Sequence, residues 1–549
     1  MTAKRKGIFV FFLFLIAGGL ISAVLRHENT WDLYNYHYYN GFALLNGRVG
    51  FDLAPAFIMS FFNPLADGVV YLLIRAFNDC VPLYSFFTGL YFGGLMYVLF
   101  LINRLFFDTS TRRGRIAAVL SLCAGATGFA TWFQIGSSTN EIPVSILVLT
   151  GIYLLLKLIA TPTGAANLKT VFIAGMLLGS AAGLKYTSAI YCLTSGIAFI
   201  LFRKRISSAS VKALLLFIAG GLAGFLAFNG YWMYLMYQNY DSPFFPLFNA
   251  VFKSPWFPEI NTRDQIHVAA RSVGRALSVP LEMINHTKKK ELVGFYRFTD
   301  ARFYFMYLFG AIFLCSRAFE NAPKPRPQTL FLMTFAGTSF LVWLFFFSII
   351  RYVIPFETVL PVLFGTALLS VAPKSKKLFR RAYVPLCVFV CAALLVTPFA
   401  SETSHLRGRK SVIAFPNGFD IPDNSLIFIL NEPSTHLVVD LLKRHPRSRA
   451  LSFSTRMDST WAIAPYGITG YGKFKEKTAE VINNHDGAFV AIGHTAFPFL
   501  NDICRPLNAL SVVSGEKPLF YFACVGDEQS MLKTFPNLYM GIIDGKKAD

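Results

Sequence analysis

The chain contains a series of long apolar segments, and this feature restricts its fold more than any other. A helix needs roughly 20 apolar residues to cross the hydrocarbon core of a bilayer, and fewer where it is partly buried in protein. Counting the clear and the shorter candidates gives about eleven spans. They are residues 7–25, 82–103, 116–135, 142–160, 170–184, 186–202, 213–237, 303–316, 328–350, 352–372 and 382–400. The sequence therefore predicts a polytopic α-helical membrane protein.

The composition agrees with this class and argues against a nucleic-acid-binding protein. Hydrophobic residues make up 54% of the chain and charged residues only 15%, which is unusual for a soluble domain. The net charge is +21. The cations cluster between apolar segments, where such charge sets topology and meets anionic lipid head groups. We expect membrane lipids, and no nucleic acid, as partners.

The charged loops alternate along the chain in a way that supports the short spans. Every second loop is basic, as the positive-inside rule requires. The basic loops hold Lys4, Arg5 and Lys6; Arg112, Arg113 and Arg115; Lys169; Arg203, Lys204 and Arg205; Lys324 and Arg326; and Lys374, Lys376, Lys377, Arg380 and Arg381. The first apolar segment is too long for the core of a signal peptide and is taken as a retained helix. The pattern predicts a cytoplasmic N-terminus.

The chain divides by character at about residue 400. Residues 1–400 are expected to form the transmembrane domain, with two long outer loops at 26–81 and 239–301. Residues 34–46 and 54–67 of the first loop are amphipathic and aromatic-rich, so interfacial helices are expected there.

Residues 401–549 are expected to form a small extracytoplasmic α/β domain. Segments 426–430 and 488–492 have the pattern of buried strands, and 435–444 and 475–484 that of helices. Cys504 and Cys524 lie in this part, and whether they form a disulfide or stay free thiols is left open.

Asp32 is the first candidate for chemistry, because a carboxylate at a membrane surface costs free energy and tends to be kept for function. Glu28 lies four residues earlier and would share a helix face with it. The two carboxylates could hold a divalent cation or supply a general base. Alternatively, Asp32 caps the following helix and Glu28 is a helix-end charge.

Glu141 and Lys185 lie at outer ends of predicted spans. Glu141 precedes Pro143, so it is either a functional acid or the acidic start of a helix. Lys185 faces outward, against the usual distribution of cations. It could bind a phosphate anion, or its side chain could reach up to the lipid head groups.

Arg351 and Tyr352 interrupt what would otherwise be one long apolar stretch. Glu357 then lies one to two helical turns into the membrane, where an acid needs a partner. Arg351 or Lys185 could supply that partner. Alternatively, Arg351 holds a phosphate through its planar fork of donors. No Gly-rich phosphate loop, zinc pattern or GxSxG elbow is found.

These motifs together resemble the GT-C glycosyltransferases, in particular the branch similar to protein mannosyltransferases and lipid A aminoarabinose transferases. Asp32, Tyr36, Ala43 and Gly47 follow in the order of that branch's first-loop motif, and Asn63-Pro64-Leu65 stands where it has Pro-Pro-Leu. The stretches Gly183-Leu184-Lys185-Tyr186 and Arg351-Tyr352-Val353-Ile354-Pro355 resemble its later motifs. Two features of the branch are missing, namely a Glu after Asp32 and a lysine before the Pro-Pro-Leu element.

The resemblance implies a hexosyl- or pentosyltransferase of a bacterial inner membrane. Its donor would be a polyprenyl-phosphate-linked sugar and its acceptor an extracytoplasmic glycan, lipid or protein. Asp32 would take the proton of the acceptor hydroxyl, and Lys185 and Arg351 would stabilise the leaving phosphate. Tyr352, Glu141, Tyr36, Glu28 and Glu357 are expected to contribute to substrate binding. A divalent cation is an open expectation. The alternatives are a lipid-linked glycan polymerase or ligase, and a transporter.

Overall fold

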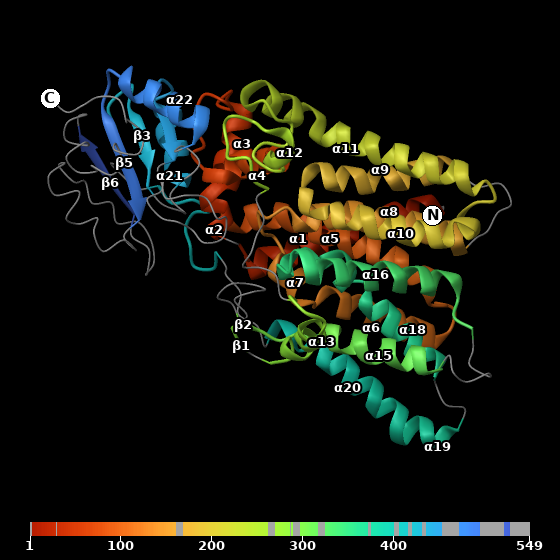
Figure 1. The fold of residues 1–549 in the computed structure, drawn as a ribbon. Coiled ribbons are helices and arrows are strands. Elements are labelled where there is room, and N and C mark those ends of the chain that lie inside the picture. Colours follow the sequence, from red (N-terminus) through yellow and green to blue (C-terminus); the bar gives the residue numbers. More distant parts are fainter. Residues whose placement is uncertain are drawn as a thin grey trace. The chain divides into compact units, whose positions relative to one another are not determined.

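The computed structural model describes residues 3–28, 30–160, 168–261, 270–285, 287–288, 297–316, 324–371, 375–399, 406–415, 420–430, 435–452, 471–494 and 521–526. The chain forms two compact units (Figure 1). The first contains Met1–Glu28, Ser85–Asn229 and Ile266–Arg407. The second contains Asn29–Tyr84, Gly230–Gln265 and Gly408–Asp549.

The first unit is almost entirely helical, with one short antiparallel pair of strands, β1 (Thr287–Lys288) and β2 (Arg297–Phe298). Its long helices are α1 (Ala3–Leu25), α5 (Val81–Phe106), α6 (Arg112–Ala126), α8 (Glu141–Ala160), α9 (Leu168–Leu184), α10 (Ala189–Ile206), α11 (Ser210–Tyr240), α13 (Val273–Glu282), α15 (Arg302–Ser316), α16 (Pro327–Phe346), α18 (Leu360–Ser370) and α20 (Val384–Leu395). Its short helical segments are α7 (Phe129–Phe133), η3 (Tyr186–Ser188), η4 (Ile350–Val353), α17 (Ile354–Glu357), α19 (Lys376–Leu378), η5 (Phe379–Tyr383) and η6 (Thr397–Phe399).

The predicted membrane class is confirmed by these helices. Within the described part of the chain, 6 helices are long and apolar enough to cross a membrane, or up to 7 if a pair bent by 42° counts as one span. That pair is Ile350–Glu357 with Leu360–Ser370. Each of the predicted spans contains a helix, but several of these are short, so the number eleven stays a prediction.

Glycines allow two of the helices, α9 and α11, to pack at backbone distance. A Cβ atom added at Gly179 would lie 1.8 Å from the carbonyl oxygen of Gly221, and one at Gly224 would lie 2.0 Å from that of Met176. Small residues at such contacts are typical of membrane helices, which gain stability from close packing rather than from the hydrophobic effect. Any side chain at Gly179 would therefore separate the two helices.

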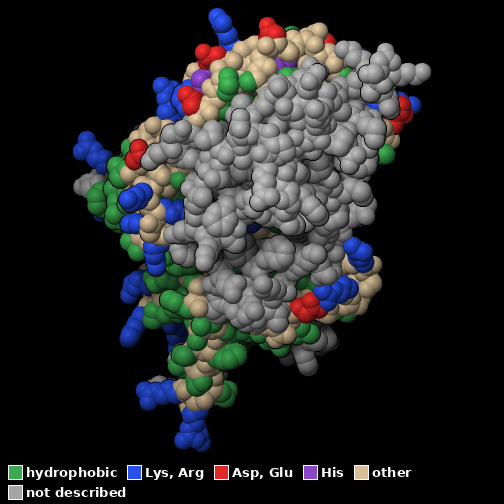
Figure 2. Space-filling model, turned by 90° about the vertical axis from the view of Figure 1, so that its left-hand side faces the viewer, with side chains coloured by type: hydrophobic (Ala, Val, Ile, Leu, Met, Phe, Trp, Pro, Cys, Tyr) green, Lys and Arg blue, Asp and Glu red, His purple; other side chains and the backbone are tan. Residues whose placement is uncertain are grey.

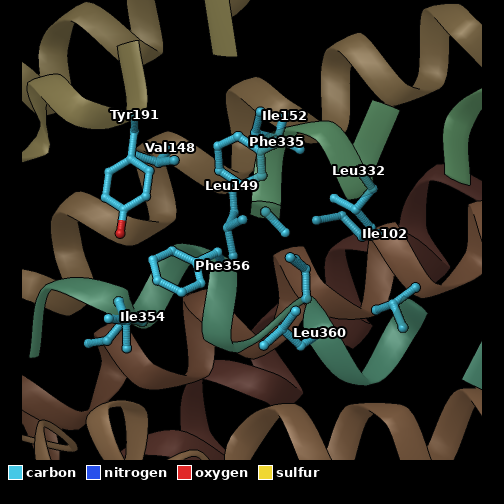
Figure 3. Close-up of a cluster of buried hydrophobic side chains, with 14 of the residues drawn as sticks. Ile102, Val148, Leu149, Ile152, Tyr191, Leu332, Phe335, Ile354, Phe356 and Leu360 are labelled. Carbon is cyan, nitrogen blue, oxygen red and sulfur yellow. The ribbon is translucent and has the colours of Figure 1, made fainter. Parts of the chain in front are cut away.

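The core of the first unit lies among α8, α10, α16 and the bent pair (Figure 3). Leu149 from α8, Phe335 from α16 and Phe356 from α17 are all fully buried there. Aliphatic and aromatic side chains interdigitate at this point, and they fix the turn between α16 and α18. This turn carries Arg351 and Tyr352.

Lys and Arg side chains gather at the lower end of the molecule, where α19 lies (Figures 1 and 2). Lys377, Arg380 and Arg381 belong to α19 and η5, directly before the apolar α20. A basic cluster next to an apolar helix is typical of a loop that stays on the cytoplasmic side. The membrane orientation itself stays a prediction.

The second unit combines the end of α11, from Gly230 to Tyr240, and parts of the two long loops with the C-terminal segment. Its helical segments are α2 (Thr30–Asp32), η1 (Leu33–His37), α3 (Tyr38–Leu45), η2 (Phe57–Phe61), α4 (Leu65–Phe77), α12 (Asn249–Phe252), α21 (His436–Arg444) and α22 (Gly472–Asn483). Its strands are β3 (Leu426–Ile429), β4 (Arg449–Ser452), β5 (Phe489–His494) and β6 (Tyr521–Gly526).

The strands form one sheet in the order β4-β3-β5-β6. β3 pairs in parallel with β4 and β5, and β6 is antiparallel to β5. The predicted strands and helices of this segment are confirmed as β3, β5, α21 and α22. Leu53 of the first loop adds a parallel bridge to Leu451, so this loop extends the edge of the sheet. The domain boundary at residue 400 and the orientation of this segment stay predictions, and Cys504 lies outside the described residues.

Candidate functional site

Three charged side chains that are far apart in the sequence meet in the first unit. Lys185 Nζ lies 2.6 Å from Glu141 Oε1, and Arg351 Nε lies 3.1 Å from the same oxygen. The carboxylate side chain of Glu141 is only 3% exposed, whereas the side chains of Lys185 and Arg351 are 18% and 20% exposed. One shielded acid thus holds two cations that still reach the surface.

Each of these residues is placed by the end of an apolar helix. Glu141 is the first residue of α8, and its own N–H donates to the carbonyl of Thr139 at 2.6 Å. Lys185 follows the last residue of α9 in an extended conformation, which turns the chain into η3. Arg351 lies in η4, just after α16. Glu141 thus starts a helix, as one of the two alternatives has it, and its role as a functional acid stays a prediction.

Tyr352 completes the cluster. Lys185 Nζ lies 5.5 Å from the centre of the Tyr352 ring, and the guanidinium carbon of Arg351 lies 5.6 Å from it. Cations at this distance from an aromatic ring are attracted by the negative charge of its face. The hydroxyl of Tyr191 donates to the main-chain carbonyl of Tyr352 and holds this turn against α10.

The four residues Glu141, Lys185, Arg351 and Tyr352 form what we call the outer cation cluster. Two cations and one carboxylate leave an excess of positive charge at the end of the helices. Guanidinium and ammonium groups in a partly desolvated setting bind phosphate oxygens through charge-assisted hydrogen bonds. The cluster is therefore suited to an anion with several oxygens, such as a phosphate ester.

Glu357 does not pair with either cation, which corrects the expectation that Arg351 or Lys185 would be its partner. It is fully buried and accepts hydrogen bonds from the N–H groups of Ala130 and Thr131, at 3.0 and 2.9 Å. The hydroxyl of Thr131 adds a third bond at 2.6 Å. Glu357 thus binds the N-terminus of α7, where the helix dipole favours an acid.

A second buried carboxylate, Asp300, was missed in the sequence. It accepts a hydrogen bond from the N–H of Phe129 at 3.0 Å and forms an ion pair with Arg302 at 2.9 Å. Arg302 is itself fully buried and also donates to the carbonyls of Ala124 and Leu394. The available signal was a pair of opposite charges directly before the apolar segment at 303–316.

Glu28 is held in place by hydrogen bonds from a neighbouring segment. Its carboxylate accepts hydrogen bonds from the N–H of Ser138 at 3.0 and 3.2 Å and from the Ser138 hydroxyl at 2.7 Å. The hydroxyl of Ser137 is a further donor. Both oxygens thus accept hydrogen bonds within the protein, and a role of Glu28 in holding a cation stays a prediction. Among the described residues no group of three or more His, Cys, Asp or Glu has the arrangement of a metal site.

Asp32 and Tyr36 belong to the second unit, so their meeting with the outer cation cluster stays a prediction. Asp32 is only 1% exposed and directly precedes η1, which is a π-helical turn. Such turns widen a helix locally and occur often at functional sites. The Tyr36 ring packs against the imidazole of His37, with ring centres 4.1 Å apart.

His37, the last residue of η1, is buried. Its Nδ1 lies 2.6 Å from Asp67 Oδ1, which joins the segment directly before α3 to the start of α4. The two helices approach so closely at Gly41 that an added Cβ would lie 2.3 Å from the carbonyl oxygen of Asp67. This contact unites the two halves of the motif in the first loop.

Another buried ion pair of the second unit is formed by Arg48 and Asp52, at 2.6 Å. Tyr39 donates to the same carboxylate at 2.6 Å, and burial, followed by the negative charge of Asp52, raises the pKa of Tyr39 well above its usual value. A cavity of about 30 Å³ borders these side chains and Tyr240. This volume holds a water molecule rather than a sugar.

The comparisons with known proteins identify the fold. No protein-family model and no curated protein matches the chain. The crystal structure of ArnT from Cupriavidus metallidurans bound to undecaprenyl phosphate is similar, with a TM-score of 0.56, 14% identity, and 95% of this chain and 98% of that chain covered. The apo structure of the same protein gives a TM-score of 0.54 at 13% identity, with the same coverage. The GT-C type of fold predicted from the motifs is thus confirmed at the level of the fold.

Proposed function

We propose that this protein is an integral-membrane glycosyltransferase that takes a sugar from a polyprenyl-phosphate donor. The outer cation cluster is the observation that carries the proposal. Its two cations, at the ends of apolar helices, suit a phosphate whose lipid chain lies in the bilayer. The similar ArnT structure holds undecaprenyl phosphate, which supports a donor of this class.

The cluster would act on the leaving group. When the acceptor oxygen attacks the anomeric carbon of the sugar, the bond from that carbon to the phosphate oxygen breaks. The departing polyprenyl phosphate then gains negative charge. Lys185 and Arg351 would stabilise this charge more strongly than the charge of the intact donor, which lowers the barrier. Glu141 would keep both side chains in place and prevent them from folding back into solvent.

Asp32 is the proposed base in this reaction. It would accept the proton of the acceptor hydroxyl as the new glycosidic bond forms. The shielded position of Asp32 directly before a π-helical turn, and its place in the first-loop motif, support this role. The sugar and the acceptor, which would be an extracytoplasmic glycan, lipid or protein, are not specified by these residues.

A polymerase or ligase of lipid-linked glycans and a transporter remain the alternative functions. Both would also bind a lipid-linked phosphate. The fate of the donor distinguishes these functions from the proposed transfer. A transporter leaves the donor intact, and a polymerase lengthens the glycan that the donor carries.

Binding of undecaprenyl phosphate to the purified protein in nanodiscs tests the donor site. We expect Lys185→Ala and Arg351→Ala each to weaken binding at least tenfold. Lys157→Ala, at the other end of α8, is the matched control and should bind as the wild type does. Equal affinity in all four proteins would exclude the cluster as the phosphate site.

Transfer is tested separately with a panel of polyprenyl-phosphate sugars and cell-envelope acceptors. Asp32→Asn should retain donor binding and lose transfer. Asp79→Asn removes the same charge from an exposed position of the same loop and should remain active. Full activity of Asp32→Asn would remove this residue from the mechanism.

A further inference from the structure

Helix α13 presents an apolar stripe on its outer side. Val273, Leu277 and Leu281 are 73%, 60% and 54% exposed, and Ile284, just beyond the helix, is 36% exposed. Their spacing of four, four and three residues places them on one face of the helix. Single exposed apolar residues need no explanation, but a continuous stripe on one helix indicates a surface for contact.

The other two sides of α13 differ from this stripe. Ala276, Val279 and Met283 are buried against the core of the first unit. Arg275 and Glu282 form an ion pair with each other, and Ser278 donates a hydrogen bond to Glu282 at 3.0 Å. The helix thus has a core side, a polar side and an exposed apolar side. This three-sided arrangement is that of a helix lying between protein, water and a third, apolar phase.

The rotation of α13 about its axis is fixed by hydrogen bonds. Pro280 lies inside the helix and has no N–H, so the carbonyl of Ala276 loses its usual partner. The hydroxyl of Tyr307, on α15, donates to this carbonyl instead at 3.0 Å. At the end of the helix, the carbonyl of Met283 accepts a hydrogen bond from the N–H of Asp300 at 2.8 Å. The stripe therefore cannot turn inward without breaking these contacts.

The neighbouring helices show which phase the stripe meets. α13 packs on α15 (Figure 1). Leu308 and Ile312 of this short apolar helix are exposed. The N–H of Ala270, shortly before α13, donates a hydrogen bond to the carbonyl of Leu344, near the end of the membrane-crossing helix α16. Phe346 at that end is exposed as well. The stripe thus continues the apolar surface of helices that cross the bilayer.

We propose that α13 lies in the interface of the bilayer, with its stripe inserted among the upper acyl chains and its Arg275–Glu282 side toward water. The partner is the lipid surface, at the end of the bundle where α16 ends and η4 carries Arg351. This inference concerns a surface outside the outer cation cluster and does not depend on the proposed reaction. A second copy of the chain or another protein on the same stripe is the competing occupant.

Photo-cross-linking of the full-length protein in nanodiscs distinguishes these occupants. A benzophenone amino acid is placed at Leu277, at Leu281 or at Glu282, and the products are analysed by mass spectrometry. Ile312 on α15 provides the lipid-facing control. We expect lipid adducts at Leu277, Leu281 and Ile312, and at least fivefold fewer at Glu282. Lipid adducts at Ile312 alone, or cross-links from Leu277 and Leu281 to a second chain, would overturn the proposal.

Discussion

Thr131 donates both its backbone N–H and its hydroxyl to one carboxylate oxygen of Glu357, at 2.9 and 2.6 Å. The other oxygen accepts from Ala130. Gly128, directly before α7, has no room for a side chain, since an added Cβ would lie 2.2 Å from the carboxyl carbon of Glu357. The segment that leads from α7 to Glu141 and the segment that carries Arg351 are therefore joined by this acid.

Glu357→Gln should destabilise the protein, because the new NH₂ group must face a backbone donor. Leaving a buried donor unpaired costs about 1–3 kcal/mol. The transition temperature in detergent, followed by circular dichroism, is the measurement. Thr131→Val removes only the hydroxyl and should have a smaller effect. A Gln variant as stable as the wild type would mean that the carboxylate is not needed at α7.

Arg351 should be sensitive to shape as well as charge. If the proposed reaction holds, Arg351→Ala should reduce the transfer rate by about 10²–10³-fold, as is found when one donor to a developing negative charge is removed. Arg351→Lys keeps the charge but not the planar fork of donors, so its transfer rate should lie between those of the wild type and the Ala variant. Rates are compared at saturating donor. A Lys variant as slow as the Ala variant would indicate that geometry alone matters.

Arg48→Ala should strongly destabilise the second unit. Asp52 is buried and would lose its ion pair, and breaking one side of a buried pair typically costs about 3–5 kcal/mol. Arg48 also donates to the carbonyls of Pro446 and Ser448. Limited proteolysis, with cleavage sites mapped by mass spectrometry, should show faster cutting at residues 446–452. The double variant Arg48→Met, Asp52→Leu should recover little of the loss, because Tyr39 and the N–H of Ala450 then lose their acceptor.

His445 should make the stability of the second unit depend on pH. Partial burial lowers the pKa of His445, but hydrogen bonds to Asp423 and Asp420, 2.6 Å away, outweigh this effect and raise the pKa above its usual value. The contribution of this contact is complete below the pKa of an unfolded histidine, near 6.5, and is lost as the pH rises through the raised pKa. Hydrogen exchange of residues 420–445 between pH 6 and pH 9 measures it, and His445→Gln should remove the dependence.

Gly179→Leu should prevent the close approach of α9 and α11. The carbonyl oxygen of Gly221 lies where the new Cβ would be, so the helices must separate by several ångströms or the protein fails to assemble. Gly196→Leu, where an added Cβ meets no atom within 4 Å, is the control. Cross-linking between cysteines placed on α9 and α11 measures the separation.

Much of the fold could be predicted because hydropathy reports directly on burial in lipid. The spans and the strands β3 and β5 are continuous apolar runs, and helices or strands form at each of them. β4 has only four residues and follows a basic segment, so it gives no comparable pattern.

The pairing of charges was harder to predict. Alternation of the loops placed Glu141, Lys185 and Arg351 on one side, but the acid expected to pair with a cation was Glu357. Glu357 is instead occupied by the N–H groups of α7, a contact that hydropathy does not indicate. The pair of His37 and Asp67 joins residues 30 positions apart through a turn that hydropathy does not describe.

The bridge between Leu53 and Leu451 has a practical consequence for work on the C-terminal segment. The N–H of Leu53 donates to the carbonyl of Ala450, and the N–H of Ser452 donates to the carbonyl of Leu53. The first loop therefore covers the edge of the sheet at β4. A fragment that starts near residue 400 would expose these backbone groups, and an unpaired edge strand can pair with an edge strand of another molecule. Such a fragment should aggregate unless the loop around Leu53 is supplied with it.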